Sequence, residues 1–234
     1  MIAVTIVALQ LVTTSAQAPP QADLVAQVRE TVAAAQRAVA AYTAAGGKAG
    51  APDHPAITWE AKIWAHRDSH PGTDAAVVAT TEAVRLLVRA ELWDRAHARI
   101  DSVGVDDRSW VRLASVVYDE GIARKDLPST IELLSRLASS TANPSNKAAA
   151  LIIVGRAYRR QGDKDAATRT LEAAKAAAPG TPYAEEADGL IYEIAHLSIG
   201  LRAPAIDAVS RDGRRVTLDG LHGKPVVLVF WGTT

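Results

Sequence analysis

The chain has 234 residues, enough for one large domain or two smaller ones, and 48% of them are apolar, which allows a sizeable core. Basic and acidic residues number 26 each, so the charge balance gives no indication of nucleic-acid binding. The chain contains no cysteine, which excludes disulfides, zinc–thiolate sites and thiol catalysis by the chain as written. Abundant alanine, with a single phenylalanine and a single methionine, favours close-packed helices.

The first residues are similar to a secretory signal peptide. The apolar run Ile2–Val12 is too short to span a bilayer comfortably. Cleavage fits after Ala16 better than after Ala18, because Pro19 would directly follow the second cut. No lysine or arginine precedes the run, so a misplaced start codon or a frayed helix is the alternative. We expect residues 1–18 to be a signal peptide and the protein to be periplasmic or secreted, with no stable membrane span.

The spacing of apolar residues predicts a helical domain over residues 19–198. Between Val25 and Tyr42 these residues recur at steps of three and four, which is one stripe of a helix. Gly46 ends this helix, and Thr58 is the expected cap of the next. The predicted helices cover residues 24–42, 58–67, 73–91, 93–101, 107–123, 127–139, 146–160, 163–177 and 182–197.

From residue 73 onward these helices pair into hairpins about 34 to 40 residues apart, which is the period of helical solenoids. In the third hairpin, small residues allow a close helix–helix approach, and Gly162-Asp163 makes the turn. This hairpin resembles a tetratricopeptide (TPR) repeat through Gly155, Tyr158, Gly162, Asp163, Ala167, Leu171, Ala174 and Pro179. The second fits loosely through Tyr118, Leu133 and Leu137. The resemblance implies protein or peptide partners bound by the repeats; a spacer or dimerisation platform is the equal alternative.

Other polar residues give weak candidate sites. His66 and His70 are four positions apart and could ligate a metal from one helix face. However, Pro71 disfavours helical backbone at His70, so a solvated loop is the expected structure and no metal or cofactor is predicted. Asp106 and Asp107 are expected to mark a helix N-terminus. Packing rather than stacking on a ligand is predicted for Trp59, Trp64, Trp93 and Trp110.

After Ile199 the helical period ends and short strands are predicted. Residues 205–209 alternate as a strand does, Asp212-Gly213 makes a turn, and residues 214–218 return. The run Val226–Phe230 has no polar member, which predicts a strand buried on both faces. The fold class expected is therefore mainly α, followed by an incomplete β segment.

Residues 199–234 resemble the start of a thioredoxin-like domain of the redoxin, TlpA-like branch, which also holds the alkyl-hydroperoxide reductases. The resemblance is carried by Gly200, Ala203, Pro204, Asp212, Gly213, Leu218, Gly223, Lys224, Pro225 and the run 226–231. It implies that the approach to the active site is formed by Phe230, Trp231, Gly232, Thr233 and Thr234. It places the first catalytic cysteine just after Thr234, where a helix N-terminus would lower the pKa of the thiol.

The resemblance implies the N-terminal part of an exported thiol–disulfide oxidoreductase or antioxidant peroxidase with a redox partner protein. The chain as written would be inactive, because it lacks the catalytic cysteine or selenocysteine. One hypothesis is that residue 235 is selenocysteine and that its UGA codon was read as a stop. A frameshift, a nonsense mutation, a contig edge and an intended truncation are the alternatives. The alternative function is a noncatalytic helical-repeat adaptor.

A physical expectation follows for the predicted strand Val226–Phe230. Without the strands and helices that would flank it, an apolar strand has open edges and promotes aggregation. We expect limited proteolysis to remove this tail readily.

Overall fold

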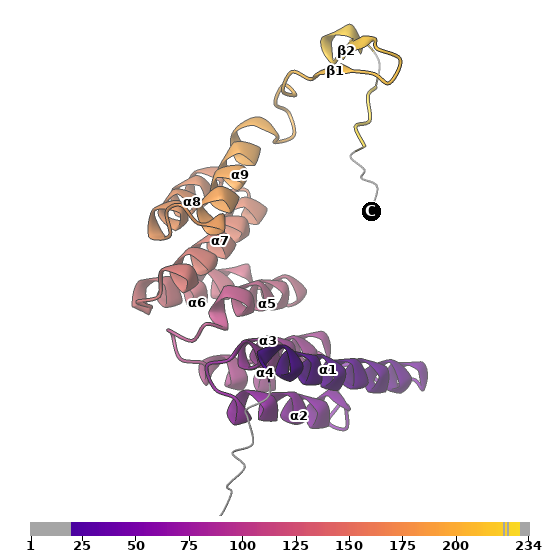
Figure 1. Ribbon diagram of the computed structural model, residues 1–234, viewed down its shortest axis with the longest axis vertical. Coiled ribbons are helices and arrows are strands. Elements are labelled where there is room, and N and C mark those ends of the chain that lie inside the picture. The colour runs from indigo at the N-terminus through magenta and orange to yellow at the C-terminus, as the bar shows by residue number, and fades with distance from the viewer. Residues whose placement is uncertain (1–19, 222, 224, 230–234) are drawn as a thin grey trace, which may run out of the picture. The chain divides into compact units, whose positions relative to one another are not determined.

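The computed structural model describes residues 20–221, 223 and 225–229 (Figure 1). Within these residues the chain forms nine α-helices and one two-stranded sheet, so the predicted mainly helical class is confirmed. The chain divides into two compact units, residues 1–119 and residues 120–234. The boundary falls inside helix α5, Trp110–Ala123.

The first unit is built around α3, whose residues are buried on most sides. Helices α1, α2 and α4 all pack against other helices of this unit, and α3 contacts each of them. Large side chains with almost no exposure on its first four helices are Val28, Ile63, Val84, Leu87 and Ile100. The helices of this unit before α5 are α1 (Gln21–Ala44), α2 (Ala56–Ser69), α3 (Asp74–Arg89) and α4 (Trp93–Asp101).

The helix ends in this unit differ from prediction at several places; α5, for example, begins at Trp110 rather than at residue 107. Thr58 does not cap α2, because the helix already begins at Ala56, whose backbone N–H donates to Nδ1 of His54 at 3.1 Å. This hydrogen bond was not predicted, since aspartate, asparagine, serine and threonine are the usual acceptors at a helix N-terminus. Thr73 caps α3 by accepting from the N–H of Ala76 at 3.2 Å.

The second unit holds a compact group of three helices. Helices α7, α8 and α9 contact one another, and α6 packs against α7. The helices are α6 (Leu127–Ser140), α7 (Pro144–Gln161), α8 (Lys164–Ala177) and α9 (Pro182–His196). A core cluster between α7, α8 and α9 is formed by Ile152, Ala167, Leu171, Ala174, Ala187, Leu190 and Ile194.

The close approach predicted at Gly155 is confirmed. A Cβ atom added there would lie 2.7 Å from Cγ of Leu171, too near for any real pair of carbons. The predicted turn is also observed. Gly162 ends α7 with φ of +88°, and Asp163 caps α8 by accepting from the N–H of Ala166 at 2.8 Å. The sequence pattern and the packing of α7 on α8 therefore agree.

The tail after α9 contains the sheet. Strands β1 (Asp207–Val209) and β2 (Arg215–Thr217) are antiparallel, with Ala208 opposite Val216, and each is shorter than predicted. The predicted buried strand at Val226–Phe230 is wrong for the four residues that the structure describes. Residues 226–229 form no strand, and their side chains are between 41% and 85% exposed. The prediction required neighbouring elements on both faces, and the described part of the tail supplies none.

Candidate functional site

The predicted approach to the active site lies outside the described residues. Phe230, Trp231, Gly232, Thr233 and Thr234 all belong to the part of the chain that is not described. The residues that lead toward them, from the connector after α9 to Val229, are described except for residues 222 and 224. This tail is therefore the first candidate site.

Hydrogen bonds at the turn fix the geometry of the β1–β2 hairpin. The N–H of Ser210 donates to the carbonyl of Arg214 at 2.8 Å, and the N–H of Gly213 donates to the carbonyl of Ser210 at 2.9 Å. Gly213 has φ of +80°, which explains why glycine occupies this position. Two hydrogen bonds to its carboxylate lower the pKa of Asp212. The hydroxyl of Ser210 has the larger effect, and the guanidinium of Arg214 has the smaller one. The turn is thus specified by its own side chains.

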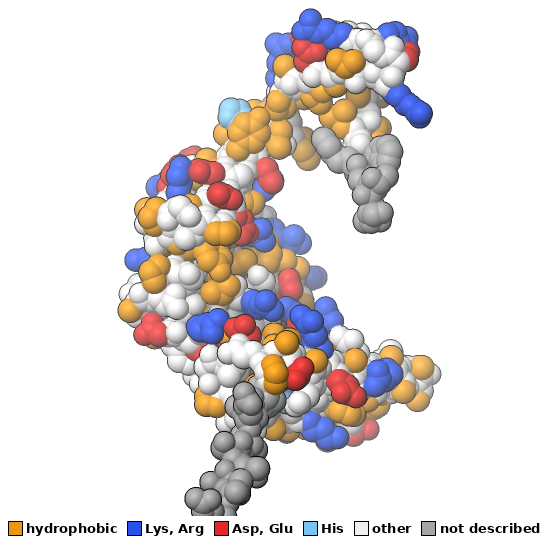
Figure 2. All heavy atoms as spheres, viewed as in Figure 1, with side chains coloured by type: hydrophobic (Ala, Val, Ile, Leu, Met, Phe, Trp, Pro, Cys, Tyr) orange, Lys and Arg blue, Asp and Glu red, His pale blue; other side chains and the backbone are white. Residues whose placement is uncertain are grey.

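An ion pair crosses the hairpin. Nε of Arg215 donates to Oδ1 of Asp207 at 2.8 Å, which lowers the pKa of the aspartate and raises that of the arginine. Both side chains are more than half exposed, so water screens the pair and its contribution to stability is small. Figure 2 shows basic and acidic side chains gathered together on the hairpin. The hairpin carries three arginines and two aspartates, and each aspartate forms an ion pair with an arginine.

The other side of the tail is apolar. A cavity of about 570 Å³ lies between the end of β2 and the extended residues 225–229. It is lined by Ala203, Leu218, Leu221, Gly223, Pro225, Val226 and Leu228. None of these side chains can ionise or attack a substrate. The described tail can therefore make apolar contacts, and any redox chemistry would have to come from other residues.

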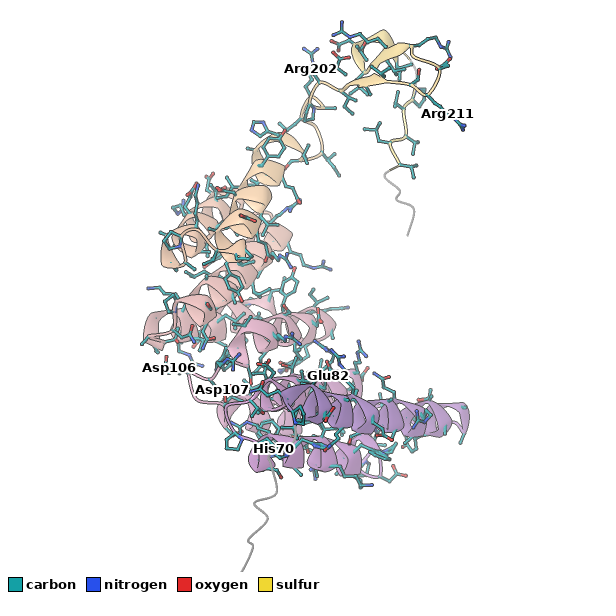
Figure 3. The ribbon with its side chains drawn as sticks, viewed as in Figure 1. His70, Glu82, Asp106, Asp107, Arg202 and Arg211 are labelled. Atoms are coloured by element: carbon teal, nitrogen blue, oxygen red, sulfur yellow. The ribbon has the colours of Figure 1, made fainter. Side chains whose placement is uncertain are left out.

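A polar cavity of about 440 Å³ lies in the first unit, beside the C-terminal end of α2. Figure 3 labels Asp106 and Asp107 in the segment before α5. Nη2 of Arg67 lies 3.4 Å from Oδ2 of Asp107, and Arg108 pairs with Asp74 at 3.0 Å. Asp107 also accepts from the N–H of Ser109, one residue before α5, in keeping with the predicted helix start. Two arginines and three aspartates line this cavity, and each arginine forms an ion pair with an aspartate, so the cavity offers no unpaired cation to an anionic ligand.

The two histidines considered as metal ligands, His66 and His70, do not belong to a group of residues that could hold a metal ion among those that the structure describes. Nε2 of His66 lies 3.0 Å from Oγ1 of Thr31, on α1. His70 directly follows the last residue of α2 and has φ of −136° and ψ of 57°. This backbone is not helical, as predicted from Pro71. Across the described residues, no group of three or more histidines and carboxylates could hold a metal ion.

The tryptophans predicted to pack do so most fully at Trp64 and Trp110, which are 5% and 3% exposed. The guanidinium groups of Arg67 and Arg99 lie over the Trp64 ring at 4.8 Å and 4.3 Å. Arg99 also donates to buried Glu60 at 2.6 Å, which connects α4 to α2. These contacts stabilise the fold and offer no open face for a ligand.

An apolar groove in the first unit was not predicted. It has a volume of about 210 Å³ and lies between α1 and α3, with Ile63 of α2 among its lining residues. Its edge carries Glu82, labelled in Figure 3, together with Arg85 and Arg89. The only signal in the sequence is the apolar stripe of α1, whose members Val32 and Val39 are half-buried in the structure. This groove is the second candidate site, because it combines apolar surface with an available charge.

The described residues thus hold two surfaces suited to contact with a partner, the apolar side of the tail and the α1–α3 groove. No helix among them is long and apolar enough to cross a bilayer. Comparison with known proteins finds no matching family model, no matching curated protein and no matching solved structure.

Proposed function

We propose that this chain is the N-terminal part of an exported thiol–disulfide oxidoreductase or peroxidase, in which residues 199–234 begin a thioredoxin-like domain. In this proposal the helices precede the redox domain and bind its protein partners. The reactive cysteine or selenocysteine is contributed by residues after Thr234, because the 234 residues contain no cysteine.

One observation carries the proposal: the apolar residues of the tail are exposed. Val227 and Val229 are 85% and 75% exposed, and Val209 is 73% exposed. Exposing this much aliphatic surface costs about 1.5–3 kcal/mol for each side chain that could otherwise be buried. Such a run is covered in a stable domain, since open apolar strands promote aggregation. A hairpin followed by an uncovered aliphatic run is what the first third of a sheet domain presents when considered alone.

The experiment compares the 234-residue chain with one extended by the residues that the gene encodes after Thr234. The shorter chain should show no reduction of insulin disulfides and no consumption of peroxide, because it has no thiol. The extended chain should show one of these activities. Replacing its first cysteine or selenocysteine with serine should abolish that activity. The proposal fails if no such residue follows, or if the extended chain is inactive while folded.

A second candidate is a noncatalytic adaptor whose helices bind a protein partner. The observation that favours it is the intact packing of the helices, from buried Val28 in α1 to buried Ile194 in α9, without any contribution from the tail. An inactive extended chain that still binds a partner through its helices would favour this candidate. An active extended chain would favour the first.

A further inference from the structure

The α1–α3 groove has the shape of a helix-docking site. Its lining residues on α1 run from Val32 to Ala40 at alternating steps of three and one. Those on α3 and its C-cap run from Glu82 to Ala90 at the same alternating steps. Each set therefore forms a stripe along one side of its helix. Eight residue steps correspond to about 12 Å, or roughly two helical turns. A bound segment would lie along both helices over that length.

The size of the groove favours side chains over a free small molecule. Its volume of about 210 Å³ is below the roughly 300–1,000 Å³ typical of small-molecule sites. Val32, Val39 and Leu86 are half-buried, and Ala40 is exposed, so the groove is apolar and accessible from one side. Two or three aliphatic side chains of a docked helix, at positions i, i+3 or i+4 and i+7, match such a groove.

The charges at the edge select the partner. Arg85 forms an ion pair with Glu82, which neutralises both. Arg89, in the last turn of α3, is exposed, and its guanidinium makes no ion pair or hydrogen bond within the described residues. Two arginines and one glutamate leave a net charge of one positive unit at the edge. A partner that places a carboxylate beside Arg89 would complete this arrangement.

We propose that this groove binds an amphipathic helical segment of another protein, with aliphatic anchors at helical spacing and a glutamate or aspartate that pairs with Arg89. The chain's own residues 1–19 are apolar but contain no aspartate or glutamate, so they do not supply the matching charge. The inference shares with the adaptor candidate the premise that the helices bind protein, and it holds whether or not the tail begins a redox domain.

The test uses the full chain and a fluorescein-labelled helical peptide of four turns that carries leucines at i, i+3 and i+7 and glutamates beside them. A matched peptide carries lysines in place of the glutamates. The acidic peptide should bind. Arg89→Glu should weaken binding of the acidic peptide about tenfold or more and strengthen binding of the lysine peptide, because like charges repel at an interface.

Ala40→Phe should fill the groove and weaken binding of the acidic peptide by about tenfold. The control, Ala41→Phe, changes an exposed neighbour that does not line the groove and should leave binding unchanged.

Several results would overturn the inference. Failure of the full chain to bind the acidic peptide would do so. Equal binding of acidic and lysine peptides would remove the role of Arg89. A concentration-dependent dimer in sedimentation that Ala40→Phe dissociates would assign the groove to a second copy instead. Peptide binding that Ala40→Phe and Ala41→Phe affect equally would place the site elsewhere and leave the adaptor function intact.

Discussion

Residues Ile152–Val154 on α7 and Val226–Val229 in the tail are both unbroken aliphatic runs, yet their environments are opposite. The three residues on α7 are between 2% and 4% exposed, whereas those of the tail are between 41% and 85% exposed. On α7, neighbouring helices cover the run from both sides, with α6 and α8 each packed against it. The tail run has no such neighbours among the described elements. Burial therefore depends on what else the chain supplies, and apolar sequence alone does not produce it.

The largest expected difference between the two regions concerns loss of an aliphatic side chain. Leu171 is 1% exposed in the core cluster of α7, α8 and α9, so Leu171→Ala should destabilise the second unit by about 2–5 kcal/mol. Val227→Ala, at an exposed position, should change the free energy of unfolding by no more than about 0.5 kcal/mol. Urea unfolding followed by far-UV circular dichroism measures both. Equal losses would show that the tail is packed in solution.

A smaller effect is expected from adding side chains instead of removing them. Gly155→Val would force a clash with Leu171 and should cost about 1–3 kcal/mol, because a packed interior accommodates extra volume poorly. Gly189→Ala is the matched control within α9, since nothing lies within 4 Å of the Cβ it would add. That variant should stabilise by about 0.5–1 kcal/mol, because alanine favours helix over glycine. Urea unfolding of each variant distinguishes the expected loss of stability in Gly155→Val from the expected gain in Gly189→Ala. Destabilisation by Gly189→Ala would indicate an element packed on that face of α9.

Acid should affect the helices more than the tail, because a buried, titratable histidine accepts a hydrogen bond at the start of α2. Burial lowers the pKa of His54 below the usual 6.5, and the charge of Asp53 opposes this only in part. A histidine with a lowered folded pKa contributes stability that is present above the unfolded pKa and is lost as the pH falls through the folded pKa. The free energy of unfolding, followed by tryptophan fluorescence, should therefore fall on acidification below about pH 6.5.

The control for this prediction is His54→Asn, which removes the titrating ring and keeps an oxygen that can accept from the N–H of Ala56. Its pH dependence should be flatter than that of the parent chain. An unchanged slope would assign the acid sensitivity to other groups.

The smallest effect is expected at the exposed ion pair of the tail. The guanidinium of Arg215 lowers the pKa of Asp207, so Arg215→Gln should move that pKa back toward its usual range. The folding of the helices should not respond, because the pair lies wholly within the hairpin. Carboxylate chemical shifts followed by NMR from neutral to acid pH measure the first effect, and the urea midpoint measures the second. A shift of the midpoint would couple the hairpin to the helices.

Local patterns were sufficient to predict most of the helices. The turn at Gly162-Asp163 and the cap at Thr73 carry short-range signals, since a positive φ and a side-chain acceptor act on adjacent residues. The hydrogen bond that His54 accepts at the start of α2 was missed because it involves a buried histidine, and spacing alone does not reveal burial. The pairing of α5 with α6 was predicted, but its tight contact at Gly121 was not, where an added Cβ would lie 2.0 Å from Oγ1 of Thr130.

The candidate sites were harder to predict than the helices. The strand expected at Val226–Phe230 was predicted because the run has no polar residue. Such a composition favours a buried strand, but it does not show whether other elements are present to cover it. The α1–α3 groove depends on the distance between two helices, and the spacing of apolar residues along the sequence does not predict that distance. Nothing in the sequence distinguishes Arg89 from the other arginines; its position beside an apolar groove does.

The contact between Gly155 and Leu171 has a consequence for how this protein can vary in evolution. Because a Cβ at residue 155 would lie 2.8 Å from Cδ2 of Leu171, the sizes of these two residues are tied together. An alanine at 155 should be accompanied by a smaller residue, such as valine, at 171. The double variant should then be more stable than the sum of the two single changes predicts. Such paired substitutions in related sequences would record the α7–α8 contact without any structure.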